Sequence, residues 1–240
     1  MDLIELKNRL KKSFSGTEKE LQKIMETVEK DQPVFPFNNY EYLIFKLIQS
    51  GRLSYEQYLD IRTEYINKNP YLKIFEKSAP TGLGMNFAEN YVIKKCSNIK
   101  IPSKKIDPNY SRDYDLWMDG IRIEVKASRA VDKDSKEPLY MKALTKNTNK
   151  RFLMNFQQLK PQYCDVFIWV AVFRDEITLW IMSSSEVQNH PLFSKGQHRG
   201  NRGNEGQLHI KHDNIHNLDK YVLNNDDDLE RAIRLAAKRK

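Results

Sequence analysis

The sequence predicts an α/β protein with a helical N-terminal region. Apolar residues recur at helical spacing through roughly the first 75 residues. From residue 113 the apolar period changes to two, which is the period of a strand. The stretch 165–173 is almost continuously apolar, as is typical of a strand covered on both faces. With 240 residues, of which 40% are hydrophobic, the chain can bury a sizeable core.

Two capping boxes mark helix starts in the N-terminal region. Thr17 and Glu20 have the required spacing, as do Ser54 and Gln57. The Asn-Pro pair at 69–70 ends the last of these helices, because the residue before proline avoids the helical conformation. This part of the chain is therefore expected to form a packed helical scaffold.

The remaining elements follow from period, turn residues and charge. We expect residues 1–80 to form a helical region packed on a core formed by 81–240, since no linker divides the chain. The expected elements of that core are a helix after the loop at 80–84, a short strand within 98–105, strands at 113–118 and 121–128, a polar loop at 129–150, a short helix at 151–160, strands at 165–173 and 176–183, a basic glycine-rich loop at 195–211, and a final helix after the aspartates at 226–228.

Charge and cysteine content narrow the classes of function. The net charge of +8 and the pI near 9.2 favour polyanionic partners such as nucleic acid. Cys96 and Cys164 are too few for a disulfide framework or a zinc cluster, so we interpret them as reduced, buried thiols of a cytoplasmic protein. No apolar run has the length of a membrane span or of a signal peptide.

A predicted hairpin brings charged side chains together. Asp119-Gly120 is a strong signal for a two-residue type I′ turn. Such a turn opposes Met118 to Ile121, Trp117 to Arg122, Leu116 to Ile123 and Asp115 to Glu124. Directly opposed residues project from the same face, so two carboxylates are expected side by side, and Lys126 and Asp113 share their face.

Adjacent carboxylates repel each other and need a compensating charge. Mg²⁺ supplies it, because this cation takes oxygen ligands from one or two carboxylates and from waters. The lysine can orient or deprotonate a water and neutralise charge on a phosphate, so the group suits the hydrolysis of a phosphodiester. The alternative is a solvated hairpin with ordinary surface ion pairs.

The stretch Asp115-(eight residues)-Glu124-Val125-Lys126 resembles the core motif of the PD-(D/E)XK nuclease superfamily. Within it the chain is most similar to a type II restriction endonuclease, in length, in its helical N-terminal region and in lacking helicase motifs. The resemblance covers about residues 84–183. It implies a restriction-endonuclease-like mixed central sheet flanked by helices, with a helix before the hairpin. Tyr114 stands where many members have proline.

Roles for the motif residues follow from this resemblance. It implies that Asp115 and Glu124 are metal ligands, that the Val125 carbonyl adds a third oxygen, and that Lys126 positions and polarises the attacking water. Glu89, on the preceding helix, matches a glutamate that many members carry near the metal; its alternative is a solvated helix residue.

Further residues are assigned less directly. Some members carry a glutamine after the motif, so Gln157 or Gln158 is a candidate, although both lie in an otherwise plain polar stretch. Asp113 is a candidate neighbour of the metal ligands or partner of Lys126. Ser128 and Arg129 extend the strand toward the substrate phosphate.

The glycine-rich loop at 195–211 is a candidate DNA contact. Its glycines permit close approach of the backbone to phosphate or bases, and Arg199 and Arg202 can hydrogen-bond guanine. His198 lies beside them. The alternative is a flexible surface loop. The scattered histidines fit a histidine-metal nuclease of the HNH type poorly.

Together these observations predict a type II restriction endonuclease. It would use Mg²⁺ to cut double-stranded DNA at a short specific sequence and leave 5′-phosphate ends. A homodimer would match a palindromic site, and a cognate DNA methyltransferase would protect the host. The alternatives are a repair, recombination or phage-associated nuclease of the same superfamily that recognises DNA structure, or a non-catalytic DNA-binding protein.

Overall fold

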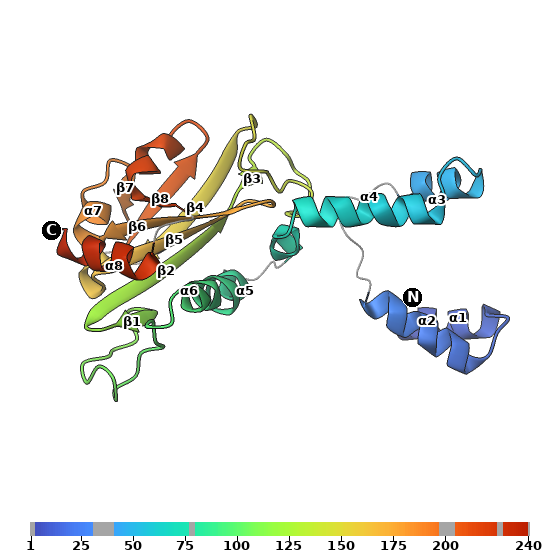
Figure 1. Ribbon diagram of the computed structural model, residues 1–240, viewed down its shortest axis with the longest axis horizontal. Helices are drawn as coiled ribbons and strands as arrows, with labels where there is room; N and C mark the ends of the chain where they lie inside the picture. The colour runs from blue at the N-terminus through green and yellow to red at the C-terminus, as the bar shows by residue number, and fades with distance from the viewer. Residues whose placement is uncertain (1–2, 31–40, 77–79, 197–204, 225–227, 240) are drawn as a thin grey trace. The chain divides into compact units, whose positions relative to one another are not determined.

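The computed structural model describes residues 3–30, 41–76, 80–196, 205–224 and 228–239 (Figure 1). The chain divides into two compact units, Met1–Arg62 and Thr63–Lys240. Each unit is described by itself.

The first unit is helical, as the sequence predicts. Its helices are α1 (Leu3–Ser13), α2 (Glu18–Lys30), α3 (Glu41–Gln49) and the greater part of α4 (Tyr55–Lys68). Both predicted capping boxes form: the Thr17 N–H donates to Glu20 Oε2 at 2.7 Å, and the Ser54 N–H donates to Gln57 Oε1 at 2.8 Å. Helix α4 ends at Lys68, directly before the Asn-Pro pair.

Several large apolar side chains of α3 and α4 are exposed, among them Leu43, Phe45, Tyr55 and Ile61, and α4 has no buried residue. The expected packing of this region on the 81–240 core stays a prediction.

The second unit begins with the end of α4 and a series of short helical segments. These are η2 (Leu72–Glu76), α5 (Pro80–Leu83), the π-helical η3 (Gly84–Glu89) and α6 (Asn90–Lys95). Leu72, Ile74 and Phe75 are buried, and the Tyr71 N–H donates to the Arg174 carbonyl at 3.1 Å. The helical region therefore reaches into this unit.

A mixed five-stranded sheet forms the centre of the second unit. Its strand order is β1-β2-β5-β6-β9; β2 and β5 are parallel, and all other neighbours are antiparallel. The strands are β1 (Leu116–Met118), β2 (Ile121–Arg129), β5 (Val166–Val172), β6 (Ile177–Ser183) and β9 (Val222–Leu223). The predicted strands at 121–128, 165–173 and 176–183 are thus confirmed, whereas only residues 116–118 of the predicted strand at 113–118 belong to β1.

A second, antiparallel sheet has the order β3-β4-β8-β7. Its strands are β3 (Val131–Asp132), β4 (Phe152–Leu159), β8 (Gly206–Lys211) and β7 (Phe193–Lys195). The remaining segments are η4 (Pro161–Tyr163), α7 (Ser184–Gln188), η5 (Ile215–Tyr221) and α8 (Leu229–Lys238). Asp228 caps α8 by accepting the Glu230 N–H at 2.9 Å, which agrees with the predicted helix start.

Several sequence predictions for this unit were wrong. Residues 80–84 are helix α5 and the start of η3 and not a loop, and the expected loop at 129–150 contains strand β3. The segment 151–160 is strand β4 and not a helix, because Phe152, Met154 and Phe156 alternate and each enters the core between the sheets. The segment 98–105 makes only an isolated bridge, between Lys100 and Trp117. The stretch 195–211 is not all loop, since its second part is β8.

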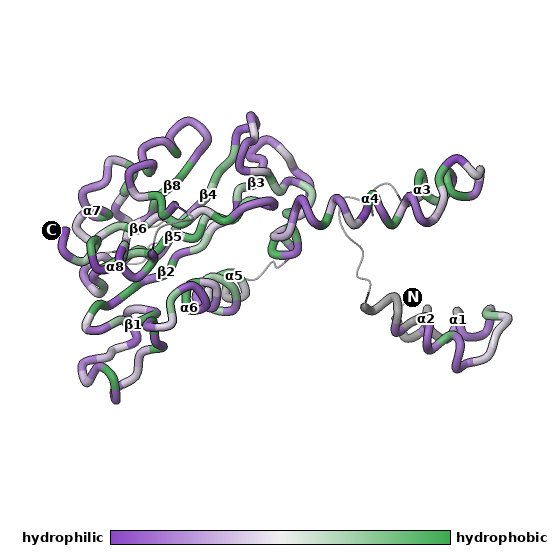
Figure 2. Tube along the Cα trace, viewed as in Figure 1, coloured by the Kyte–Doolittle hydropathy of each residue, from purple (hydrophilic) through white to green (hydrophobic). Residues whose placement is uncertain are grey.

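The two sheets pack on each other through aromatic side chains. Phe156 of β4 meets Trp169 of β5 edge to face, with ring centroids 5.0 Å apart. Alternate residues of β5 join this core, and the others, such as Val166 and Ile168, are buried on the opposite face, where α8 covers β5 and β6. Figure 2 shows apolar stretches along these strands. Burial on both faces explains why the β5 sequence is continuously apolar.

Both cysteines are free and buried, as predicted. Among the described residues, no helix combines the length and apolar character needed to cross a membrane.

Candidate active site

The hairpin turn forms as the sequence predicts. Asp119 and Gly120 have φ values of 47° and 90°, so both turn residues have positive φ. The observed pairs are Leu116 with Ile123, Trp117 with Arg122 and Met118 with Ile121, which is the predicted register.

Asp115 lies just outside this ladder. Its N–H donates to the carbonyl of Ile123 at 3.0 Å, although Ile123 is already the partner of Leu116. The expected direct opposition of Asp115 and Glu124 is therefore replaced by a local irregularity. The Asp115 side chain instead accepts the N–H of Val125 through Oδ2 at 2.9 Å. This bond still holds the carboxylate beside Glu124.

Glu124 and Lys126 form an ion pair, with Lys126 Nζ 2.6 Å from Glu124 Oε1. Glu124 is only 9% exposed, and the Lys126 side chain is 20% exposed. In the register of β2 and β5, Lys126 is the partner of Trp169, so it leaves the sheet on the side of the second sheet. The alternative of a solvated surface ion pair does not describe this arrangement.

Asp113 does not contact Lys126, the neighbour that the residue count from the hairpin turn predicts. Its carboxylate accepts a hydrogen bond from Ser111, whereas Lys126 pairs with Glu124. The ladder begins only at Leu116, so Asp113 is not held opposite Lys126.

Beyond Ile123, the edge of β2 that faces β1 has no strand partner in the described sheet, because β1 is only three residues long. The Val125 N–H points to this open edge, where it binds Asp115. In a strand the N–H and C=O of one residue point to the same side. The Val125 carbonyl is therefore directed toward the same open edge of β2 as its N–H.

A cleft of about 630 Å³ lies along this open edge. It is lined by Glu89, Asp115, Val125 and Lys126, and Glu124 is held beside it through its ion pair with Lys126. Glu89 comes from the π-helical turn η3, which packs against β2. The structure thus brings together the four side chains that the sequence analysis selected for catalysis.

Burial of this acidic group shifts its proton affinities. Burial raises the pKa of Glu124 to about 7; Asp115 adds to the rise and Lys126 opposes it. Burial also raises the pKa of Glu89 to about 7, with a further contribution from Asp115. The pKa of Asp115 is raised by burial, against the lowering effect of the Val125 N–H and of Lys126. Such displaced values are common where carboxyl groups do chemistry.

Ser128 and Arg129 also line the cleft. Ser128 is 8% exposed, and its Oγ accepts the N–H of Asn155 at 2.9 Å, which ties β2 to β4. Arg129 donates from Nη1 to the Ile74 carbonyl at 3.2 Å, and burial lowers the pKa of its guanidinium. This residue therefore brings a half-buried cation to the cleft lining.

The other predicted DNA contacts, His198, Arg199 and Arg202, lie outside the described residues. Gln157 and Gln158 line the same cleft as Asp115 and Lys126.

Sequence reasoning missed two residues near the site. Asn155 lies on the cleft wall and Lys160 lies close enough to lower the pKa of Glu124. Both belong to β4 or follow it directly. The alternation of Phe152, Met154 and Phe156 was the signal that could have placed them.

The donor set fits a hard divalent cation. Two carboxylates and one carbonyl oxygen leave room for waters, as Mg²⁺ prefers. Among the described residues, no group of three or more His, Cys, Asp or Glu side chains is arranged to hold a metal.

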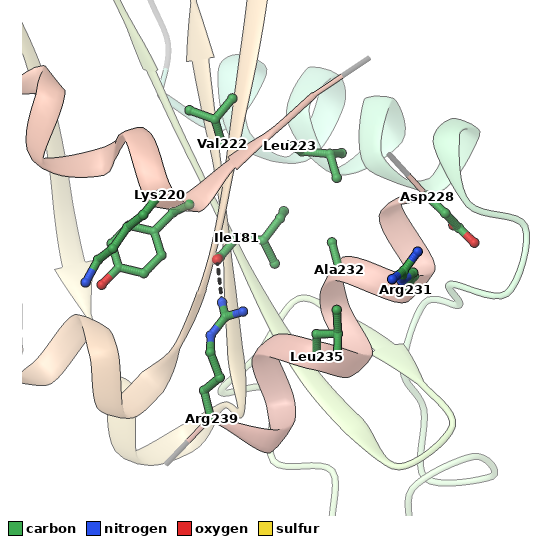
Figure 3. Close-up of a pocket in the computed structure, with 10 residues that line it drawn as sticks. Ile181, Lys220, Val222, Leu223, Asp228, Arg231, Ala232, Leu235 and Arg239 are labelled. Carbon is green, nitrogen blue, oxygen red and sulfur yellow. Dashed lines mark hydrogen bonds between the residues drawn. The ribbon is translucent and has the colours of Figure 1, made fainter. Parts of the chain in front are cut away.

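A second cleft, of about 370 Å³, lies between β6, β9 and α8 (Figure 3). Lys220, Arg231 and Arg239 line it. Arg239 already has partners within the protein, since it donates to the Ile181 carbonyl at 3.0 Å and forms an ion pair with Glu186 at 2.9 Å. Asp228 supplies the carboxylate of this lining, whereas the first cleft is lined by Glu89 and Asp115 together with the half-buried Lys126.

Comparison with protein-family models finds no match for this chain, and comparison with curated proteins finds no significant match.

Proposed function

We propose that this protein is a Mg²⁺-dependent nuclease that hydrolyses phosphodiester bonds of double-stranded DNA, and that it acts as a type II restriction endonuclease with a short recognition sequence. The observation that carries the proposal is the convergence of Asp115, Glu124, Lys126 and Glu89 at one open strand edge beside a cleft.

Each residue has a role that its position supports. Asp115, Glu124 and the Val125 carbonyl would hold Mg²⁺, which supplies Lewis-acid polarisation of a phosphodiester. Lys126 places its ammonium at the cleft wall, where it orients a water and offsets charge developing on the phosphate. Glu89 is able to hold or release a proton near neutral pH, since its pKa is about 7.

The remaining features of the proposal concern the substrate and the assembly. The surplus of eight positive charges favours a nucleic acid. Arg129 would contact a phosphate from within the cleft. A homodimer would present two such clefts to the two strands of a palindromic site.

Digestion of phage and plasmid DNA with Mg²⁺, followed by sequencing of the fragment ends, tests the proposal. We expect discrete fragments with 5′-phosphate and 3′-hydroxyl ends, and no fragments in EDTA. A smear, or a preference for branched DNA, would instead indicate a structure-specific nuclease. Binding without any cleavage across a Mg²⁺ titration would indicate a DNA-binding protein and would overturn the proposed activity.

A further inference from the structure

One wall of the cleft is built from carboxamide side chains. Asn155, Gln157 and Gln158 of β4 are exposed and line the cleft that also holds Asp115 and Lys126. Each carboxamide offers an acceptor oxygen and a two-hydrogen donor. Pairs of such groups suit the edge of a nucleobase, which also carries donors and acceptors side by side.

A backbone irregularity turns two consecutive glutamines to the cleft. The pairing of β4 with β8 shifts between Phe156 and Leu159, and Gln158 has a φ of 57°. In a regular strand, neighbouring residues point to opposite faces, so one glutamine would enter the core between the sheets. The bulge leaves both exposed. Positive φ costs free energy in a residue other than glycine, and such bulges commonly re-aim side chains at functional sites.

Apolar side chains complete the cleft. Leu83 and Met85 come from the α5–η3 segment, Leu139 comes from the loop before β4, and Leu153 comes from β4 itself. Met85 is 62% exposed, although it is a large apolar residue. A flat ligand with apolar faces and polar edges would match this combination of surfaces.

We infer that the cleft receives one unpaired nucleobase of the strand being cut, and that Asn155, Gln157 and Gln158 bind its edge. This inference rests on the proposed function and specifies its substrate. The volume of about 630 Å³ lies within the range of 300–1,000 Å³ that is usual for small-ligand pockets.

The shape of the cleft distinguishes the binding of an unpaired base from the reading of paired bases in a DNA groove. Bases inside a duplex are read by a helix or a two-stranded ribbon that protrudes into the groove. Here the carboxamides line a recess, so the base must protrude instead. A base leaves the stack at least cost where it is mismatched, damaged or already single-stranded.

Base preference in DNA binding tests the inference without requiring cleavage. Every protein in the test is the full chain with Lys126→Ala, so that the probe stays intact in Mg²⁺. The probes are fluorescein-labelled homopolymers of dA, dC or dT, and binding is followed by anisotropy. The variants add either Gln157→Ala with Gln158→Gly or, as a matched control, Gln162→Ala. Gln162 is an exposed glutamine of η4 that is not part of the cleft lining.

The Lys126→Ala chain without further substitutions is the parent. We expect its affinities for the tightest and weakest homopolymers to differ by at least about tenfold, as one well-placed carboxamide contact allows. The double substitution should reduce this ratio to less than about threefold and leave the weakest affinity unchanged, and the control should keep the full ratio. The thermal unfolding midpoint should not fall, because glycine adopts positive φ without the strain that glutamine has at this position.

A parent with a ratio below about threefold, or a double variant that keeps the parent ratio, would overturn the inference. These outcomes are distinct from failure of the proposed function. A chain that never cuts DNA can still lose its base preference in the variant, and a chain that cuts without base preference refutes only the inference.

Discussion

Lys126 both pairs with a buried carboxylate and lines the cleft. Its ammonium is 2.6 Å from Glu124 and also reaches the cleft. We predict that Lys126→Ala lowers the single-turnover cleavage rate by at least about a hundredfold, because positioned proton-transfer and electrostatic groups contribute about that much. DNA affinity should change less than about threefold.

The matched control for this change is Lys136→Ala, at an exposed lysine of the 129–150 loop. It should cleave at the wild-type rate. Full cleavage by Lys126→Ala, measured in the same single-turnover assay, would remove Lys126 from the mechanism.

Glu124 makes stability depend on pH. Its pKa of about 7 in the folded chain exceeds the ordinary glutamate value of 4.5. The fold therefore favours the protonated form, so this contribution is complete below pH 4.5 and is lost as pH rises through 7. Glu124→Gln, which keeps a neutral side chain, should unfold at a similar temperature to wild type at about pH 4.5 and at a higher temperature at about pH 8.

Metal-free thermal denaturation across this pH range measures the effect, with Glu137→Gln as the exposed control. Added Mg²⁺ should raise the wild-type midpoint at about pH 8 and have little effect at about pH 5, where Glu124, with its pKa of about 7, is protonated. A difference between wild type and Glu124→Gln that shrinks as pH rises would contradict the assignment.

At the scale of elements, the hairpin turn positions the acidic pair. Gly120 has a φ of 90°, and a Cβ added there would meet no atom within 4 Å. Gly120→Ala should therefore destabilise the protein only through backbone strain, by about 1–2 kcal/mol. Urea unfolding measures this loss.

Gly84→Ala is the companion substitution. A Cβ added at Gly84 would also meet no atom within 4 Å, but Gly84 lies in a helical segment and does not have positive φ. It should not lower the free energy of unfolding, since alanine favours helix. Equal losses at Gly84 and Gly120 would show that backbone conformation at the turn is not the cause.

The elements that the sequence predicted well have local signals. The Asp-Gly turn and strict alternation defined the hairpin, and continuous apolar character defined β5. Strand β4 escaped prediction because its alternation stops at the bulge, where Gln157 and Gln158 are both exposed. Its partner β8 is about fifty residues away, and no local pattern encodes that pairing.

The candidate site was likewise predictable only where local sequence signals define it. Spacing placed Asp115, Glu124 and Lys126 together, because a two-residue turn fixes the register. The spacing did not predict that Asp115 leaves the ladder and binds the Val125 N–H. Nor did it predict that Glu124 is buried, since burial depends on contacts between distant segments.

At the scale of the whole molecule, the net charge of +8 should dominate the affinity for DNA. Each phosphate contact releases counterions, so the logarithm of the binding constant should fall linearly with the logarithm of salt, with a slope of about −0.9 for each contact. We predict a slope steeper than about −3 for the Lys126→Ala protein on duplex DNA. Anisotropy titrations at several KCl concentrations measure this slope, and a slope near zero would exclude phosphate-dominated binding.

The claim on which the account depends is that Asp115 and Glu124 together hold a divalent cation. Titration of the protein with Mn²⁺, used as a spectroscopic substitute for Mg²⁺ and followed by electron paramagnetic resonance at about pH 8, tests it most directly. We predict saturable binding in the wild type, at least about tenfold weaker binding in Asp115→Asn and Glu124→Gln, and unchanged binding in Asp134→Asn, an exposed control outside the cleft. Binding in Asp115→Asn that is as tight as in the wild type, or no saturable binding by the wild type, would contradict the account.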